Sequence, residues 1–137
     1  MKKTSVKLRK VNQSDFRFLY NLLNERDPNA NISHRKMPTY TEHVKFIKSR
    51  PYSKWNIIEY GSQKVGSIYL SKNDEIGIFL KKQFHGKDIG QPSLELFIKM
   101  NPRKRYLANV NPKNTKSKKF FKKSGFRLIQ YTYELKR

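Results

Sequence analysis

Three short apolar segments between residues 55 and 80 constrain the fold most, because residues that favour turns separate each segment from the next. Trp55–Tyr60 and Val65–Leu70 flank the sequence Gly61-Ser62-Gln63, and Asn73-Asp74 precedes Glu75–Leu80. Segments of this length, rich in β-branched and aromatic residues and joined by short turns, are typical of antiparallel strands. The sequence therefore predicts a three-stranded meander at the centre of the chain.

Helices and further strands surround this meander. Asn12 or Ser14 can cap a helix over residues 16–23, and the capping-box sequence Thr39-Tyr40-Thr41-Glu42 begins a second helix that ends before Pro51. The connection from Arg26 to Pro38 is expected to be irregular. We expect the remaining elements at residues 5–11 (strand), 83–90 (loop), 92–100 (helix), 106–110 (strand), 115–124 (helix) and 126–135 (strand).

The resulting order is β-α-α-β-β-β-α-β-α-β. Helices and strands in this order predict an α+β fold with a mixed, mostly antiparallel sheet flanked by helices. A chain of 137 residues has the length of one domain, so we expect a single domain over residues 1–137.

The composition excludes several kinds of site. The chain has no cysteine, which excludes disulfides, zinc–thiolate sites, iron–sulfur clusters and a cysteine nucleophile. Its three histidines are isolated, so we expect no metal site. No run of about 18 apolar residues is present, and the basic start Met1-Lys2-Lys3 leads into no apolar segment. We therefore expect a soluble, cytoplasmic protein without a membrane span.

The net charge of +21 indicates an anionic partner such as nucleic acid, an acidic surface or a phosphorylated ligand. Residues 101–137 hold 12 basic residues and one acidic residue, so the charge is concentrated near the C-terminus. A basic nucleic-acid-binding module is one interpretation, although no aromatic stacking platform or recognition helix is evident. A solvated lysine surface is the other.

Two sequence blocks carry the candidate chemistry. The loop from His85 to Gly90 lies between a predicted strand and a predicted helix, and its glycines let the backbone approach an anion closely. The N-terminus of a helix attracts phosphate through its unpaired amides and its dipole, and Lys87 adds charge. The second block begins at the turn Asn111–Asn114 and continues through the next helix to Gly125-Phe126.

The two blocks, in this order and spacing, resemble the GNAT acetyltransferase superfamily over nearly the whole chain. The pyrophosphate-binding loop of that family reads Q/R-x-x-G-x-G/A between a strand and a helix, and the six matching positions here are His85 to Gly90. A later family motif, N-x-x-S/A-x-x-x-Y-x-x-x-G-F, is matched here by Asn114, Ser117, Phe121, Gly125 and Phe126.

The resemblance implies a binding site for acetyl-CoA as co-substrate. The backbone of the strand ending at Leu80 would pair with the pantetheine arm, the loop amides would hold the pyrophosphate, and lysines of the last helix would meet phosphates. The coenzyme-binding residues implied in this way are Ile78, Phe79, Leu80, His85, Gly86, Lys87, Asp88, Ile89, Gly90, Gln91, Asn114, Ser117, Phe121 and Lys123.

The acid–base half of the resemblance is altered. Asp88 replaces the central glycine of the loop, Phe121 replaces the tyrosine that acts as general acid in the family, and Asn109 stands where some relatives carry a glutamate base. Glu75 is our candidate for the general base, although an ordinary carboxylate beside a turn has the same sequence context. Tyr133 or Tyr131 is the candidate replacement for the missing tyrosine, and packing is the alternative role.

His34 and His43 lie in the region that forms one wall of the acceptor site in this family. His43 is therefore a second candidate base, with a role on the helix surface as the alternative. Only eleven residues follow Phe126, where the family commonly has two strands. Either these two strands merge into one, or a partner subunit closes the sheet, so we expect a monomer or a homodimer.

We therefore expect an acetyl-CoA-dependent N-acetyltransferase that acts on a primary amine. The acceptor classes are an amino-sugar nucleotide, a small amine or a protein N-terminus, and the positive charge suits RNA or the ribosome nearby. A non-catalytic acyl-CoA-binding protein and a nucleic-acid-binding module are the alternatives.

Overall fold

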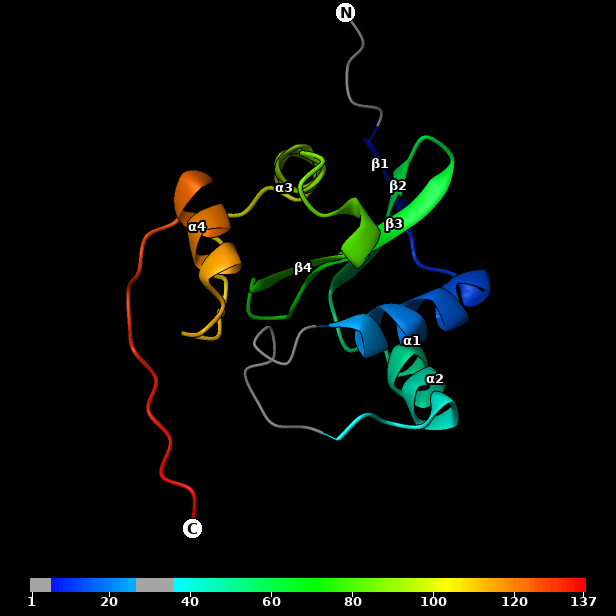
Figure 1. Ribbon diagram of the computed structural model, residues 1–137, viewed down its shortest axis with the longest axis horizontal. Coiled ribbons are helices and arrows are strands. Elements are labelled where there is room, and N and C mark those ends of the chain that lie inside the picture. The colour runs from blue at the N-terminus through cyan, green and yellow to red at the C-terminus, as the bar shows by residue number, and fades with distance from the viewer. Residues whose placement is uncertain (1–5, 27–35) are drawn as a thin grey trace, which may run out of the picture.

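The computed structural model describes residues 6–26 and 36–137, and its centre is a four-stranded sheet (Figure 1). The strands are β1 (Val6–Lys10), β2 (Lys54–Tyr60), β3 (Gln63–Leu70) and β4 (Ile76–Leu80). All neighbours are antiparallel, in the spatial order β1-β2-β3-β4, which confirms the predicted meander. Gly61 and Ser62 join β2 to β3 with φ of 59° and 82°, the left-handed conformation that a two-residue hairpin turn requires.

Helices cover both faces of the sheet (Figure 1). The helices α1 (Phe16–Glu25) and α2 (Tyr40–Lys48) lie on one face, and α3 (Gly90–Met100) lies on the other. The helix α4 (Thr115–Lys123) follows beside β4 and α3, and two 3-10 turns, η1 (Gln13–Asp15) and η3 (Lys82–Phe84), complete the described elements. No helix within the described ranges is long and apolar enough to cross a membrane.

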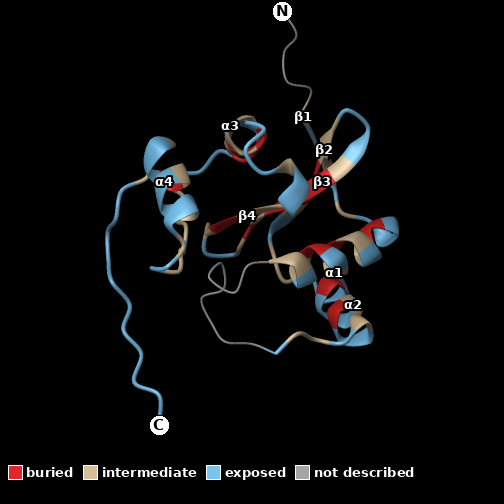
Figure 2. Cartoon of the chain, in the orientation of Figure 1, coloured by how far each residue is buried: buried red, intermediate tan, exposed pale blue. Residues whose placement is uncertain are grey.

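Apolar side chains from alternating strand positions form a core on each face of the sheet. On the α3 side, Ile58 and Ile68 pack with Leu94 and Phe97. On the α1 and α2 side, Ile57 packs with Leu19 and Ile47, and Figure 2 marks buried residues on both helices. The α+β class and the antiparallel sheet flanked by helices are thus confirmed.

Two predicted strands are not formed. Residues 106–110 make a single parallel bridge, between Leu107 and Glu75, because the chain leaves β4 after that point. Residues 126–135 form no strand: the N–H of Phe126 donates to the carbonyl of Phe121, and residues 127–135, which Figure 2 shows exposed, have no backbone partner among the described residues. Alternating residues favour a strand, but a strand also needs a neighbour for its hydrogen bonds.

The predicted cap is present at α2, whereas α1 has Asp15 as its N-cap and no side-chain cap of its own. Thr39 and Glu42 form the reciprocal capping box of α2. Before α1, Asn12 and Asp15 form a second capping box at η1, and the carboxylate of Asp15 has no exposed surface. Arg9 and Lys64 each place a nitrogen 2.8 Å from this carboxylate, so the start of α1 is fastened to β1 and β3.

We predict that Asp15→Asn lowers the free energy of unfolding by about 3 kcal/mol, because it leaves two cations around a neutral buried group. Burial alone would raise the pKa of Asp15, but hydrogen bonds from Arg9 and Lys64 lower it to about 2. The wild-type protein should therefore lose stability as the pH falls below 3.8, the ordinary value, and the variant should not show this loss. Urea denaturation at several pH values measures both effects.

The matched control is Glu95→Gln, because Glu95 is exposed on α3. Equal losses of stability in the two variants would contradict the structural role of Asp15.

Candidate functional site

The edge of β4 that faces away from β3 is largely open. The N–H of Ile76 donates to the carbonyl of Leu107 at 2.7 Å, and the N–H of Leu107 donates to the carbonyl of Asp74 at 2.9 Å. No further bridge joins β4 to residues 108–114 in the described chain. Because backbone groups two residues apart on a strand point to the same side, the N–H and C=O of Ile78 face this open edge.

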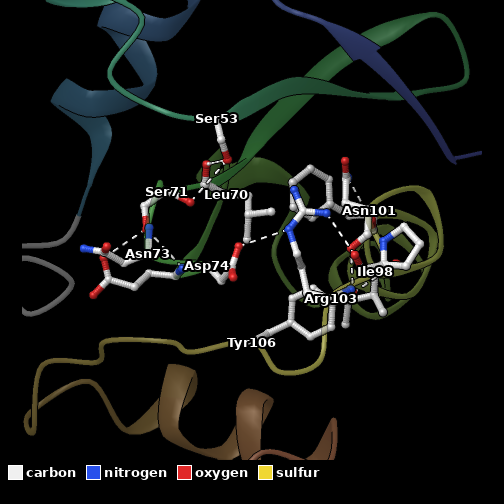
Figure 3. A network of polar contacts seen from close by, with 12 residues as sticks. Ser53, Leu70, Ser71, Asn73, Asp74, Ile98, Asn101, Arg103 and Tyr106 are labelled. Atoms are coloured by element: carbon white, nitrogen blue, oxygen red, sulfur yellow. Dashed lines mark hydrogen bonds and ion pairs between the residues drawn. The ribbon is translucent and has the colours of Figure 1, made fainter.

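A network of polar contacts fixes the point where β4 and the segment that follows Leu107 separate (Figure 3). The guanidinium of Arg103 donates to Asp74 at 3.1 Å, and the backbone N–H of Arg103 donates to the hydroxyl of Tyr106 at 2.9 Å. That hydroxyl in turn donates to the carbonyl of Asn101, at the end of α3, at 2.6 Å. The turn before β4 is thereby held to residues 101–107 and to α3.

Glu75 lies at this point of separation, at the head of β4. Its carboxylate accepts hydrogen bonds from the hydroxyl of Ser71 at 3.0 Å and from the side-chain amide of Asn109 at 2.8 Å. Asn109 stands where some relatives carry a glutamate base. The carboxylate of Glu75 lies beside this position, on the neighbouring segment. Strand alternation places Glu75 on the same face of β4 as Gly77 and Phe79.

The loop between β4 and α3 leaves the N-terminus of α3 free of side-chain caps. The helix begins at Gly90, two residues before the predicted start, with Ile89 as N-cap. Neither a side-chain cap nor an acidic residue lies in its first turn. Asp88 is exposed, with φ of 54°, and does not cap the helix. The amides at this tip are therefore open to an anionic ligand.

Three contacts hold the tip of α3 in place. The ring of His85 bonds the carbonyl of Leu80 at 3.0 Å, which ties the loop to the end of β4. A Cβ at Gly90 would lie 3.0 Å from the ring of Phe120, so glycine there lets α4 pack closely. Ser124, at the end of α4, donates to the side chain of Gln91 at 2.9 Å.

The α4 residues of the family motif have mainly structural contacts. The side chain of Asn114 accepts the N–H of Ser117 at 3.1 Å and so caps α4. Phe121 is buried, with its ring centroid 5.1 Å from those of Phe120 and Phe126.

Three other residues predicted to bind the coenzyme are exposed: Gly86, with φ of 74°, Lys87 and Lys123.

Two candidate catalytic residues lie apart from β4. Tyr133 is 89% exposed in the segment that follows α4, and the structure does not bring it to Glu75. His43 is buried on α2 between the rings of Tyr20 and Phe46, and burial lowers its pKa. His34 lies outside the described residues.

The sequence analysis missed a tyrosine and an arginine on the α1 and α2 face of β4. A Cβ at Gly77 would overlap the ring of Tyr69, so the end of this side chain lies directly over the strand. Burial raises the pKa of Tyr69, which keeps the phenol protonated. The guanidinium of Arg26 lies 3.7 Å from the ring centroid of Phe79. In the β3–β4 register, Gly77 lies opposite Tyr69, and this pairing is the sequence signal that could have indicated a tyrosine over the strand.

Comparison with known proteins gives the family. A family model described as an acetyltransferase (GNAT) domain matches residues 5–127. The chain therefore belongs to the GNAT acetyltransferase family. A search of curated proteins found no match.

Solved structures share the fold at low sequence identity. A domain from Methanocaldococcus jannaschii has a TM-score of 0.82 at 24% identity, covering 96% of this chain and 94% of its own. An acetyltransferase from Thermus thermophilus has a TM-score of 0.74 at 20% identity, with coverages of 95% and 92%. A ribosomal-protein α-N-acetyltransferase in complex with coenzyme A has a TM-score of 0.73 at 18% identity, with coverages of 93% and 83%.

We predict that His43 makes the stability depend on pH in the neutral range. Because burial lowers the pKa of His43, the unfolded chain binds the proton more readily, and the free energy of unfolding should fall as the pH drops below 6.5, the ordinary value. His43→Gln should flatten this dependence in thermal unfolding between about pH 7 and pH 5. His85→Gln, at an exposed histidine, is the control, and an unchanged slope in His43→Gln would show the prediction to be wrong.

Proposed function

We propose that this protein is an acetyl-CoA-dependent N-acetyltransferase that acts on a primary amine. The observation that carries the proposal is the opening along β4 beyond the Glu75–Leu107 bridge. A carboxylate lies at one end of this opening, and the uncapped N-terminus of α3 follows its other end. Membership of the GNAT family supports the same activity.

The open edge of β4 fits an extended chain that carries amide groups. The C=O of Ile78 and the N–H of Leu80, which faces the same edge, can pair with the pantetheine arm as one strand pairs with another. The first-turn amides of α3, at Gly90 and Gln91, can bind the pyrophosphate at the positive end of the helix dipole. Lys87 and Lys123 are exposed and can add positive charge near the phosphates. Coenzyme A bound to a structural relative is consistent with this assignment.

Transfer to an amine needs a proton acceptor and a polarised carbonyl. The amine nitrogen attacks the thioester carbonyl carbon, and Glu75 takes the proton that the nitrogen loses. The N–H of Ile78 can donate to the carbonyl oxygen as negative charge develops there. The carbon–sulfur bond then breaks, and the thiolate leaves with coenzyme A.

The leaving sulfur needs a donor other than the residue on α4, because Phe121 has no hydroxyl and its ring is buried. The phenol of Tyr69 stays protonated and lies over Gly77, one residue before Ile78. We assign it as the hydrogen-bond donor at this part of the strand, in place of Tyr133.

The test is release of free coenzyme A from acetyl-CoA with a panel of a polyamine, an amino sugar and a peptide with a free N-terminus. We predict that Glu75→Gln lowers kcat by about 100-fold or more, because positioned proton transfer contributes at least this much. Glutamine can still accept the hydrogen bond from Ser71 or Asn109, so the fold should be retained, as thermal unfolding can verify.

Glu134→Gln serves as the control, because Glu134 lies in the exposed C-terminal segment. A Glu75→Gln variant with wild-type kcat would remove Glu75 as base. If acetyl-CoA binds and no acceptor releases coenzyme A, the protein is a binding protein and not an acetyltransferase.

A further inference from the structure

Arg26 is a half-buried cation without an acidic partner among the residues that the structure describes. It follows the last residue of α1 and lies over the ring of Phe79 on β4. Its Nε atom is inaccessible to solvent and has no hydrogen-bond partner. The neighbouring Glu25 forms no ion pair with it, and one oxygen of its carboxylate accepts the backbone N–H of Lys82 at 3.1 Å.

This arrangement differs from that of other arginines in the described chain. Arg9 pairs with Asp15 and Glu59, and Arg103 pairs with Asp74. Arg17 also lies over an aromatic ring, at 3.8 Å from the centroid of Tyr40, but it is exposed. Removing a charge from water without a counter-charge is costly, and a cation–π contact offsets only part of that cost. An anionic ligand at Arg26 would supply the missing partner.

The electrostatic surroundings of Arg26 fit a binding site. The described groups that influence its charge are the phenols of Tyr69 and Tyr52, which hydrogen-bond each other, and no described carboxylate is among them. Desolvation lowers the pKa of Arg26, as expected for a cation kept from water. The guanidinium of Arg26, with its planar donor geometry, suits phosphate or carboxylate.

Arg26 lies on the same face of β4 as the proposed base. Glu75, Gly77 and Phe79 alternate along this face, with Tyr69 over Gly77 and Arg26 over Phe79. At about 3.3 Å of rise per residue, the Cα atoms of Glu75 and Phe79 are roughly 13 Å apart. An amine that reacts beside Glu75 can therefore reach Arg26 only with a group several bonds away from its nitrogen.

We propose that Arg26 binds an anionic group, a phosphate or a carboxylate, carried by the acceptor several bonds from its reacting amine. This inference rests on the proposed acetyltransferase function and names its substrate class. Phosphorylated amino sugars and long ω-amino acids have this chemistry, whereas α-amino acids are too short.

The experiment compares matched acceptors that differ only in the anionic group. The carboxylate arm uses 6-aminohexanoate against hexylamine, with glycine as the short acid, and the phosphate arm uses glucosamine 6-phosphate against glucosamine. A charged hydrogen bond is worth about 1.5–3 kcal/mol, so we expect kcat/KM to be about 10- to 100-fold higher for at least one anionic acceptor than for its neutral match. The arm with the larger ratio identifies the anion.

Variants at Arg26 locate this preference. Arg26→Gln should remove it by raising KM for the anionic acceptor, and Arg26→Lys should keep part of it because the charge remains. The matched control is Arg17→Gln, which removes an exposed arginine that also lies over a ring and should leave the ratio unchanged. Thermal unfolding verifies the fold, and Arg26→Lys carries the test if Arg26→Gln does not fold.

Two outcomes would overturn the inference: equal kcat/KM for each anionic acceptor and its neutral match, or a preference that survives in Arg26→Gln. If the wild-type protein turns over no acceptor, the acetyltransferase proposal fails separately. Calorimetric titration with glucosamine 6-phosphate then tests Arg26 directly. Binding that Arg26→Gln abolishes would support the anion site without catalysis, and absence of binding to the wild-type protein would refute it.

Discussion

The site depends on the single bridge that joins β4 to the segment after α3. Ile76 and Leu107 pair once, the ion pair of Arg103 with Asp74 fixes that point, and the two segments then separate. Backbone polar groups rarely remain without partners, so the edge at Ile78 requires water or a ligand chain with its own amides. One interaction therefore determines both where the sheet ends and where an extended ligand can add to it.

The two faces of β4 have different roles in the proposed enzyme. On the α3 side, packing of Phe120 against Gly90 and the bond from Ser124 to Gln91 hold the helix tip at the end of the opening. On the α1 and α2 side, Tyr69 and Arg26 cover the strand. The coenzyme and the acceptor would thus approach the same strand from different elements.

Local sequence signals predicted much of the fold. The turn at Gly61-Ser62 and the capping box at Thr39 depend on neighbouring residues, and the structure has them at the predicted places; the loop before α3 is also present, although the helix begins two residues earlier than predicted. Alternation also predicted strands at 106–110 and 126–135, but a strand needs a pairing partner, which alternation does not reveal.

Contacts between distant residues explain most of what the sequence did not predict about the site. Asn109 and Glu75 are 34 residues apart, so their hydrogen bond had no local signature, although each residue had been singled out. Arg26 is one of 31 basic residues, and its contact with the distant residue Phe79 has no local signature in the sequence.

Hydrogen exchange measured by mass spectrometry, with and without acetyl-CoA, tests the central claim most directly. If the open edge of β4 and the tip of α3 bind the coenzyme, exchange should slow in peptides covering residues 76–80 and 86–93 and remain unchanged in β1. Binding that protects only the lysine-rich residues 113–123, or no protection at all at saturating acetyl-CoA, would contradict the account.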